Sequence, residues 1–529
     1  MGLIVPQHPS KNRACATVDA SAKSSDDGNT FMAERIYLHQ GLLPTFTSAV
    51  PIVNRLPLHD ASITKGEETE DVFTKILRSN RDSTVKLYHG DIVMDTSYSA
   101  IKCTSCLWTK SEDGVVRVPY KLAPDYRDED KKLITEALET FKTLTCIQFK
   151  ERTTEKDYLK IHSGSGCWSS IGKVGGAQEL SLMSGGCMAT GIVQHEIEHA
   201  LGFYHEQSRS DRDQHVDVMW QYINKGDWGE FDLVDTDNMN LPYDYASVMH
   251  YGRFSYSNTS GEPSLNPKPD QSVAIGQRYG LSPLDVSKVK KLYGCDICSF
   301  LLTGTNGTLD FETFTSSHKD STSCLWLVRV NRNKTFLQFD KFDLPASAEC
   351  TAYHITVYDG PSKTSPVLLD RMCGAHELPL MVASKNSVLV EFVFEGPLAA
   401  VDVKASYGLV DCGGTYTTDN GTITSPSYPD PYPNLSDCIT AIWAPEGHQI
   451  VLNFTVFDVE YSSSCLYDYL TIYDGGRTDS PLLGRYCSTG PIPTIISTGD
   501  VLLLEFRSDV WFNMDGYSAN YYFVKSPSV

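Results

Sequence analysis

The stretch HEIEHALGFYH, which runs from His195 to His205, is the most informative part of this sequence about fold and function. On a helix, His195 and His199 lie one turn apart and share a face, so one rigid element presents both imidazoles. Gly202 can adopt a positive φ, end the helix and turn the chain so that His205 reaches the same point. Glu196 adjoins the first of these imidazoles. The spacing therefore predicts that three imidazoles and one carboxylate converge.

Three imidazoles in this arrangement are a typical ligand set for zinc, at nitrogen–metal distances of about 2.0–2.1 Å. Glu196 is placed to take a proton from a water held at such a metal, which is the work of a general base. The alternative is a helix that carries three unrelated histidines, one buried and the others solvated. Five specified positions match by chance in about one chain of this length in ten thousand. We therefore favour a zinc site.

Two other stretches carry residues that suit this site. Ser247-Val248-Met249-His250-Tyr251 places Met249 where it could form an apolar floor beneath the metal, and it could bring the phenolic oxygen of Tyr251 to the zinc. Its alternative is ordinary core packing. Upstream, the stretch from Tyr88 to Ile92 contains Asp91 directly after a flexible glycine. That carboxylate could occupy the open metal position and keep an enzyme silent, or it could lie in a surface turn.

The composition limits the possible classes of protein. The chain has 529 residues, 41% of them apolar and 21% charged, which is enough for several domains with buried cores. Its net charge is −21, from 45 basic and 66 acidic residues, without a basic block. This charge disfavours nucleic acid and anionic membrane surfaces as partners. Because no run of about 18 apolar residues occurs, we expect no membrane-spanning helix.

Cysteines and glycosylation sequons indicate an oxidising, secretory route. Fifteen cysteines occur, and all except Cys15 lie from Cys103 onward, which leaves an even set of fourteen. Six Asn-x-Ser/Thr sequons are present, at Asn258, Asn306, Asn333, Asn420, Asn434 and Asn453. We expect a secreted, extracellular protein. Met1 to Pro6 do not open a clean signal peptide, so we expect either a different start or atypical export.

Residues 99–295 have the patterns of a compact mixed domain. Helical spacing of apolar residues predicts helices, and alternation predicts strands. The expected helices are Asp130 to Phe141 and Leu281 to Tyr293; the expected strands are Cys146 to Lys150, Leu159 to His162 and Glu179 to Met183. Asp71 to Ser79 could form a further helix. Strands between Ser163 and Met183 are expected to supply an edge for an extended substrate.

After Cys295 the chain is an internal repeat of one β-rich unit. Cys298, Cys324, Cys350 and Cys373 recur 114 or 115 residues later as Cys412, Cys438, Cys465 and Cys487. Tyr358-Asp359-Gly360 recurs in the same way as Tyr473-Asp474-Gly475. The simplest interpretation of these offsets is that the chain contains two copies of the unit.

These motifs resemble one family. HEIEHALGFYHEQSRSDRD from His195 to Asp213 and SVMHY from Ser247 to Tyr251 resemble the astacin metalloproteases among the metzincins, and the two repeats resemble CUB domains. The domain order is similar to hatching enzymes of the amphibian type. The resemblance implies a multidomain protein in which a two-lobed α+β catalytic domain precedes two all-β CUB sandwiches. Its expected segments are residues 1–98 (N-terminal region and inhibitory propeptide), 99–296 (protease), 298–409 (CUB 1) and 412–524 (CUB 2).

The resemblance also implies roles for particular residues. His195, His199 and His205 would be zinc ligands, with Glu196 as general base and acid. Tyr251 would be a fifth ligand that swings away to stabilise the developing oxyanion, and Met249 would form the Met-turn. Asp91 would be the inhibitory aspartate, in a motif where Tyr88 replaces the family's Phe.

Activation is the next implication of the resemblance. Propeptide cleavage would create an N-terminus that folds towards Glu206, the residue after the third histidine. Ser99-Ala100-Ile101-Lys102-Cys103 is similar to the start of mature hatching enzymes and suggests cleavage after Tyr98. The usual basic residue is absent there, which leaves the activating protease open.

The resemblance further implies the disulfide pairing. The pairs are Cys146–Cys295, Cys167–Cys187, Cys298–Cys324, Cys350–Cys373, Cys412–Cys438 and Cys465–Cys487, with Cys103–Cys106 as an extra N-terminal pair. A C-x-x-C motif can also be redox-active or bind metal.

Calcium is a second expected cofactor, because some CUB domains bind it through a Glu and two Asp. The second repeat has Glu460, Asp468 and Asp509 at the matching places. The first repeat has Pro345, Tyr353 and Glu395 there, so we expect one calcium site, in the second CUB domain only. The alternative is three solvated acidic residues.

The expected function is a secreted zinc metalloendopeptidase, made as a zymogen, that hydrolyses extracellular protein such as egg-envelope glycoproteins at hatching. Arg278 could shape the pocket after the cleaved bond and favour acidic residues, or it could be a surface arginine. One alternative is a processing protease for collagen or growth-factor precursors. Another is a secreted adhesion protein, with CUB domains that bind glycans or proteins and a non-catalytic zinc domain. Apart from substrates, the expected partner is an activating protease.

Overall fold

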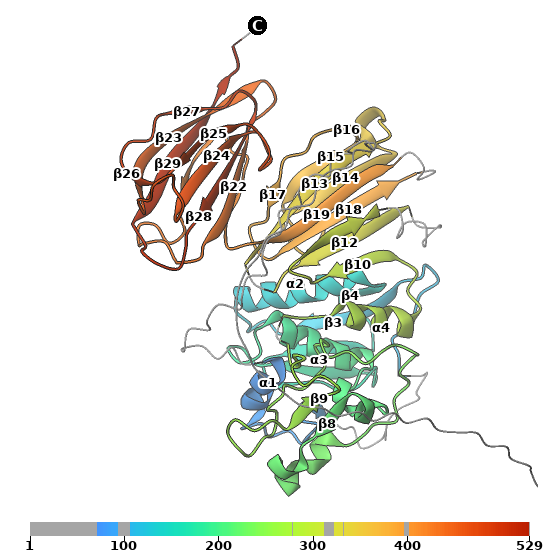
Figure 1. Ribbon diagram of the computed structural model, residues 1–529. Helices are drawn as coiled ribbons and strands as arrows, with labels where there is room; N and C mark the ends of the chain where they lie inside the picture. The colour runs from blue at the N-terminus through green and yellow to red at the C-terminus, as the bar shows by residue number, and fades with distance from the viewer. Residues whose placement is uncertain are drawn as a thin grey trace, which may run out of the picture. The chain divides into compact units, whose positions relative to one another are not determined.

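The computed structural model describes residues 71–93, 106–277, 279–311, 322–331, 333–395 and 401–527, all within one compact unit, Glu68–Val529. Figure 1 shows an α+β part followed by two parts built from strands. This arrangement confirms the predicted fold class. Tyr98, Ser99 and Cys103 lie outside the described residues, as does Arg278.

A five-stranded sheet forms the frame of the α+β domain, in the order β4-β3-β5-β7-β6. The strands β3, β4, β5 and β7 run parallel, whereas β6 is antiparallel to β7 and forms an edge. The bounds are Val116–Leu122 for β3, Ile147–Glu151 for β4, Tyr158–His162 for β5, Cys167–Trp168 for β6 and Ala177–Leu182 for β7. The three predicted strands are therefore present, each shifted by one or two residues.

Four helices accompany this sheet in the described part of the domain. They are α1 Val72–Asn80, α2 Asp128–Leu144, α3 Thr190–Leu201 and α4 Pro283–Tyr293. Asp71 caps α1, because its carboxylate accepts the Thr74 amide, and Ser282 caps α4 in a capping box with Asp285. The predicted helices are thus confirmed, with α2 three residues longer at its C-terminus than expected. The apolar faces of α2 and α3 share one core with the sheet.

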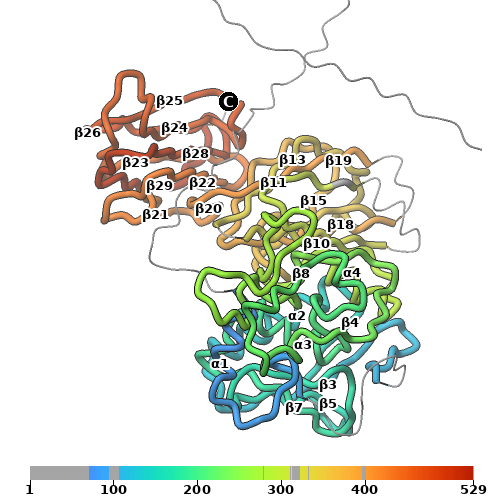
Figure 2. The backbone as a smooth tube through the Cα atoms, turned by 60° about the horizontal axis from the view of Figure 1, so that its bottom comes forward, coloured from blue at the N-terminus to red at the C-terminus, as the bar shows by residue number. Residues whose placement is uncertain are grey.

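Short elements complete the domain. The strands β1 Leu87–Tyr88 and β2 Ile92–Val93 form a hairpin, and β8 Val216–Val218 pairs with β9 Leu265–Pro267. Five 3-10 turns occur in the described chain, at Glu206–Ser208, Arg212–Gln214, Trp220–Tyr222, Lys225–Phe231 and Ala348–Cys350. Figure 2 shows the blue segment of α1, which packs next to α3.

The two repeats have the same topology. Each contains one sheet of five strands and a second of four with a short fifth strand at its side: β10-β12-β18-β14-β15 with β11-β19-β13-β16 and β17, then β20-β22-β28-β24-β25 with β21-β29-β23-β26 and β27. In each, the first strand pairs in parallel with the third, which puts Cys298 opposite Cys324 and Cys412 opposite Cys438. The sequence repeat is therefore a structural repeat.

The strands of the first repeat are β10 Cys298–Leu302, β11 Asn306–Asp310, β12 Ser323–Arg329, β13 Lys334–Leu344, β14 Tyr353–Tyr358, β15 Val367–Met372, β16 Gly374–Ala375, β17 Met381–Val382, β18 Ser387–Phe394 and β19 Asp402–Val410. Those of the second are β20 Cys412–Tyr416, β21 Asn420–Thr424, β22 Asp437–Trp443, β23 His448–Val459, β24 Tyr469–Asp474, β25 Leu482–Tyr486, β26 Ser488–Thr489, β27 Ile495–Ile496, β28 Val501–Arg507 and β29 Gly516–Lys525. In both repeats, alternate residues of the two sheets face a shared apolar core.

Six disulfides join twelve of the described cysteines. They are Cys146–Cys295, Cys167–Cys187, Cys298–Cys324, Cys350–Cys373, Cys412–Cys438 and Cys465–Cys487, the same six pairs that the resemblance implies. The first closes the α+β domain between the start of β4 and the end of α4. The Cys103–Cys106 pair stays a prediction, because Cys103 is outside the described residues.

Candidate metal centre

Helix α3 carries the first two histidines on one buried face. His195 and His199 are fully buried, and their ring centroids are 4.8 Å apart. The helix ends at Gly202, whose φ of +110° allows its amide to bond back to the carbonyls of Glu198 and His199. This left-handed residue redirects the chain, and His205 returns to within 4.8 Å of the His199 ring. The predicted role of Gly202 in bringing the three rings together is confirmed.

Backbone carbonyls fix the orientation of two of these rings. The Nδ1 atom of His195 lies 2.8 Å from the Val248 carbonyl oxygen, and that of His199 lies 2.8 Å from the Phe203 carbonyl oxygen. Since a carbonyl can only accept, each Nδ1 carries the proton of its hydrogen bond. In each neutral ring the Nε2 atom then keeps a free lone pair, which points inward as metal coordination requires.

Asp91 completes the cluster. Its Oδ2 atom lies 2.9 Å from His195 Nε2, and its Oδ1 atom lies 3.4 Å from His199 Nε2 and 3.2 Å from His205 Nε2. One donor atom from each of the four residues fits within 4.8 Å of the others. Asp91 is fully buried, so it does not lie in a surface turn, which was the alternative considered for it.

The chemistry of this donor set calls for a shared cation. His199 Nε2 and Asp91 Oδ1 are buried without hydrogen-bond partners in the described structure. Lone pairs of several imidazoles and a carboxylate repel one another at these distances unless a positive charge lies among them. A proton can bridge only one pair at a time, whereas a tetrahedral metal ion engages all four donors. The residues therefore fit a metal such as zinc.

The charges in the cluster point the same way. Burial by itself would raise the pKa of Asp91, but the imidazoles of His205 and His199 hold it well below its usual range. Burial lowers the pKa of His205 to about 3 and also lowers that of His199. The cluster thus favours an ionised carboxylate among neutral imidazoles, which is the state that binds a metal.

The segment around Asp91 is joined by a single parallel β-bridge, Ile92 to Ser169, to the residue just beyond the edge strand β6. The Ser169 amide donates to the Asp91 carbonyl at 3.1 Å, and the Val93 amide donates to the Ser169 carbonyl at 2.9 Å. Gly90, at a φ of +84°, lies against the Tyr256 hydroxyl, which a Cβ atom would meet at 2.6 Å. At Ser169, the edge expected to receive substrate is therefore covered by residues upstream of the α+β domain.

Helix α1 is a part of this cover to which sequence reasoning assigned no role. The Phe73 ring is fully buried and stacks on Tyr251 at 3.7 Å between centroids, and it meets the His205 ring edge-on at 5.1 Å. At the other end of the helix, Asn80 bonds Cys167 in β6 through both its side-chain atoms. The helix itself was expected, and the capping Asp71 and the apolar face of Val72, Phe73 and Ile76 are the signals for it.

Glu196 lies beside the metal cluster but does not enter it. It is fully buried, and neither carboxylate oxygen has a hydrogen-bond partner among the described residues. Burial, and then the nearby charge of Asp91, raises its pKa well above the usual range. A carboxylate with free oxygens and a raised pKa is suited to accept and return a proton.

The Tyr251 hydroxyl donates to the His89 carbonyl at 2.8 Å. Its expected role as a fifth zinc ligand stays a prediction. Asp91 and the backbone next to it take the space on this side of the cluster. The phenol is therefore available to the site only when the segment containing His89 leaves.

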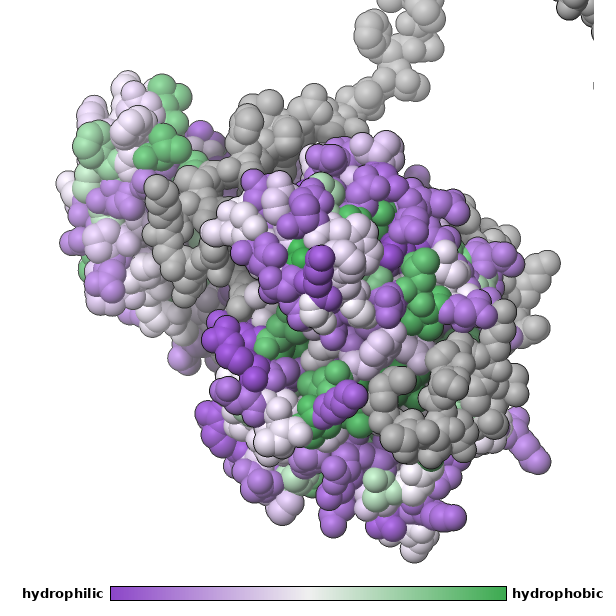
Figure 3. Space-filling model, turned by 90° about the horizontal axis from the view of Figure 1, so that it is seen from below, coloured by the Kyte–Doolittle hydropathy of each residue, from purple (hydrophilic) through white to green (hydrophobic). Residues whose placement is uncertain are grey.

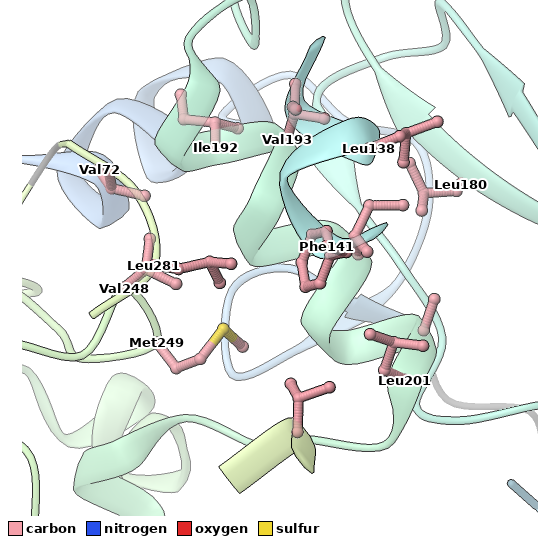
Figure 4. Packing of buried hydrophobic residues seen from close by; sticks show 14 of the residues in the cluster. Val72, Leu138, Phe141, Leu180, Ile192, Val193, Leu201, Val248, Met249 and Leu281 are labelled. Carbon is pink, nitrogen blue, oxygen red and sulfur yellow. The ribbon is translucent and has the colours of Figure 1, made fainter. Parts of the chain in front are cut away.

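The turn before Tyr251 supports the site from below. The Ser247 hydroxyl and the Val248 amide both donate to the buried carboxylate of Asp285 on α4, at 2.6 and 2.9 Å. Met249 is 1% exposed and packs in the core beneath the site, and Figure 4 shows it together with Val248 and the apolar residues of α3. This turn supplies the carbonyl that orients His195.

Glu206 lies between the third histidine and this turn. Its amide donates to the Met249 carbonyl at 3.0 Å, and its carboxylate is buried among Arg209, Lys288 and the Asp244 amide. The residues expected to form the mature N-terminus are not described, so the expected contact with Glu206 stays a prediction.

A second acidic cluster lies in the second repeat. One carboxylate oxygen each of Glu460, Asp468 and Asp509 lies within 4.8 Å of the others. Asp468 accepts the Asp509 amide at 2.7 Å and the Tyr432 hydroxyl at 2.6 Å, whereas one oxygen of Glu460 is buried without a partner in the described structure. Burial and the neighbouring carboxylates raise the pKa values of Glu460 and Asp468. The oxygens suit a hard cation such as calcium.

Two family profiles and several known proteins match this chain. The profile of the astacin family of peptidases matches residues 102–294, and the CUB domain profile matches residues 298–407 and 412–521. The chain is 42% identical to embryonic protein UVS.2 of Xenopus laevis, over 90% of this chain and 92% of that protein. It is 45% identical to the astacin-like metalloendopeptidase of Gallus gallus, over 68% of this chain and 89% of that protein.

A third relative is high choriolytic enzyme 1 of Oryzias latipes, 44% identical over 44% of this chain and 86% of that protein. Its solved structure, described as a hatching enzyme zinc-protease, covers 37% of this chain and 100% of that chain, with a TM-score of 0.36. In the described part of our chain, no helix combines the length and apolar character needed to cross a membrane. The chain belongs to the astacin family of zinc metalloendopeptidases, with two CUB domains after the protease domain.

Proposed function

We propose that this protein is the zymogen of a secreted zinc endopeptidase, and that residues 71–93 hold it in a latent state. The observation that carries the proposal is the convergence of His195, His199, His205 and Asp91 on one point. The three imidazoles would hold zinc, and Asp91 would fill the fourth position until the propeptide is removed. Both contacts of this segment, with the metal site and with the sheet edge, oppose substrate binding.

In the mature enzyme the residues around the metal have distinct tasks. Bound zinc would supply a Lewis acid that polarises a carbonyl and lowers the pKa of water. Glu196, with both oxygens unpartnered, would accept a proton from the attacking water and return it to the leaving amine. The Tyr251 hydroxyl, released from the His89 carbonyl, would donate to the oxygen that becomes negative as the peptide bond is attacked.

The sheet edge would align the substrate. In the zymogen, Ser169 just beyond β6 bonds the backbone around Asp91 through its amide and its carbonyl. Once these groups are free, an extended peptide can pair with them, as peptides do at exposed strand edges. The backbone of the substrate would then lie next to the histidine cluster.

We propose extracellular protein as the substrate, and egg-envelope glycoprotein in particular. The support for this choice is the similarity in sequence to a hatching enzyme and to an embryonic protein. Six disulfides and six sequons, five of which have exposed asparagines, support a secreted protein. A processing role on collagen or growth-factor precursors is the alternative result of the test below.

The test has two stages. Casein zymography of the processed, secreted protein, with and without a zinc chelator, distinguishes a protease from an adhesion protein: we expect a lysis band that the chelator removes. The purified mature protein is then incubated separately with vertebrate egg envelope and with procollagen, and the new N-termini are sequenced. We expect defined cleavage of envelope proteins, and defined cleavage of procollagen alone would overturn the hatching assignment.

We also propose a calcium ion in the second CUB domain, held by Glu460, Asp468 and Asp509. The buried, unpartnered oxygen of Glu460 supports this site, because it lies next to two further carboxylates and has no proton donor in the described structure. An ion there would join the loops after β23 and β28 to the start of β24, at one end of the domain.

A further inference from the structure

A buried ammonium group, that of Lys288, lies next to the Glu206 carboxylate, and no function has yet been assigned to it. Lys288 lies on α4 and is 9% exposed, and its Nζ atom donates to Glu206 Oε2 at 2.6 Å. The other oxygen, Oε1, accepts from Arg209 Nη1 at 3.0 Å and from the Asp244 amide at 2.8 Å. Both oxygens of Glu206 are thus engaged by groups within the protease domain itself.

Several buried carboxyl groups lie in this region: Glu198, Glu206, Asp244 and Asp285 are each at most 5% exposed. Among the cations, Arg209 pairs with Glu206, the buried Arg329 acts on Asp285, and Lys288 lies 2.6 Å from Glu206 and 3.7 Å from Asp285. Burial raises the pKa of Asp244 to about 6, and the charge of Lys288 acts in the opposite direction. The carboxylates keep the pKa of Lys288 raised despite its burial. Lys288 is therefore a counter-ion of both Glu206 and Asp285.

The same helix face connects to two of the three histidines. Asp285, one turn before Lys288, holds the Val248 amide, and the Val248 carbonyl orients His195. Lys288 holds Glu206, which directly follows His205 and bonds the Met249 carbonyl through its amide. Because one peptide bond joins Glu206 to His205, a displacement of Glu206 would also displace the third histidine.

We propose that Lys288 is a positioning residue, a resident ammonium that neutralises Glu206 and fixes His205, so that the active geometry does not depend on an amine created by propeptide cleavage. The proposal rests on the proposed proteolytic function. It differs from the expectation that the new N-terminus has to pair with Glu206. Removal of one member of a buried ion pair leaves the other as an uncompensated charge, so the site should be sensitive to this lysine.

The first test leaves the sequence of the protease domain intact. The N-terminus of the activated wild-type enzyme is determined by sequencing, and the same enzyme is prepared with one additional glycine at that end, which displaces the amine. We expect kcat/KM of the two forms to agree within about twofold. A fall of about tenfold or more in the extended form would overturn the proposal, because it would show that the terminal amine is required.

The second test changes the lysine. In Lys288→Met we expect kcat to fall about tenfold or more with KM within about twofold, since the metal geometry and not substrate affinity is disturbed. Lys288→Arg, which keeps the charge, should recover to within about threefold. The matched control is Lys291→Met, an exposed lysine on the same helix, which should behave as wild type. Equal activity of the Lys288→Met and Lys291→Met enzymes would contradict the proposal.

A spectroscopic readout separates this proposal from the proposed function. The visible absorption of the protein with cobalt(II) in place of zinc reports the geometry of the ligands without any turnover. We expect the spectrum to change in Lys288→Met and to stay unchanged in Lys288→Arg and Lys291→Met. Failure of wild-type protein to hydrolyse any peptide would overturn the proteolytic function, whereas an unchanged spectrum in Lys288→Met would overturn the role of Lys288. If Lys288→Met does not fold, the glycine extension and the arginine variant still decide.

Discussion

At the scale of single residues, the site depends on which atoms lack partners. The Nδ1 atoms of His195 and His199 are bound by carbonyls, so the lone pairs that remain point at Asp91. Glu196 lies next to this cluster with two oxygens that have no partner among the described residues, although a buried carboxylate normally has donors. Buried polar groups without partners raise the free energy of the folded state. A metal ion would engage the imidazoles and Asp91, and a reacting water would engage Glu196.

The role of Glu196 gives the first prediction. Glu196→Gln removes the proton acceptor and keeps the side-chain size, so we expect peptidase activity to fall about 10²-fold or more while zinc stays bound. Activity is measured on a fluorogenic peptide after activation, and zinc by elemental analysis. The control is Glu136→Gln, an exposed glutamate on α2, which should leave both unchanged. Full activity of Glu196→Gln would refute the mechanism.

Asp91 gives the second prediction. In the unprocessed chain, Asp91→Ala removes the fourth donor, so we expect basal activity to rise about tenfold, equivalent to ~1.4 kcal/mol of lost latency. Hydrolysis is followed while gels verify that the chain stays uncleaved. The exposed Asp82→Ala variant serves as the control. Basal activity of Asp91→Ala equal to that of wild type would show that this carboxylate does not silence the enzyme.

At the scale of elements, latency is a joint property of α1 and the hairpin β1–β2. The hairpin adds backbone to the sheet edge, and α1 places Phe73 against Tyr251 and His205 while Asn80 bonds β6. Neither element is long enough to be stable alone, so both depend on packing against the protease domain.

Phe73 gives the third prediction. Phe73→Ala leaves a cavity beside the histidines and loses the ring stacking, at a cost of about 3–5 kcal/mol in a buried site. We expect the propeptide of this variant to be cut faster by added trypsin, with a rise in activity of the uncut chain. The comparison is Lys75→Ala on the same helix, whose side chain is partly exposed. Cleavage at the wild-type rate would argue against a role for α1 in latency.

Sequence alone predicted the zinc site better than it predicted how residues 71–93 cover that site. The zinc motif is local: His195, His199, Gly202 and His205 follow from helix geometry and one positive φ. The cover depends on contacts between residues far apart in the chain, such as Phe73 with Tyr251 and Asn80 with Cys167, which no short pattern encodes. For the same reason the ion pair between Lys288 and Glu206, 82 residues apart, was not predicted.

At the scale of the whole molecule, the chain joins one catalytic domain to two copies of a β-rich module, each with a core of its own. The copies share topology and disulfides, yet the acidic trio is found in the second copy, where Asp468 and Glu460 stand at positions that Tyr353 and Pro345 take in the first. Figure 3 shows one face of the molecule on which apolar groups lie in small, separate patches among polar ones.

The calcium site gives the fourth prediction. In the full-length protein, about 10 mM calcium should raise the melting temperature of one calorimetric transition by about 4 °C or more, and Asp468→Asn should abolish the shift. Asp419→Asn, an exposed position in the same domain, is the control. A shift of equal size in Asp468→Asn would contradict the site.

The pH dependence of this shift follows from the charges. Burial and like charges raise the pKa values of Glu460 and Asp468 in the folded state. Without calcium, these groups therefore destabilise the native state as pH rises through their folded pKa values, because they ionise more easily when unfolded. Calcium binds the ionised forms, so the calcium-induced shift should be larger at about pH 7 than at about pH 5. A shift that decreases over this interval would contradict the assignment.

The most direct test of the latent zinc site is anomalous diffraction at the zinc absorption edge from crystals of the unprocessed full-length chain. We expect one strong zinc peak within about 2.0–2.2 Å of the Nε2 atoms of His195, His199 and His205 and of one carboxylate oxygen of Asp91. A zinc peak that lacks Asp91 as a ligand, or no peak among the three imidazoles, would contradict it.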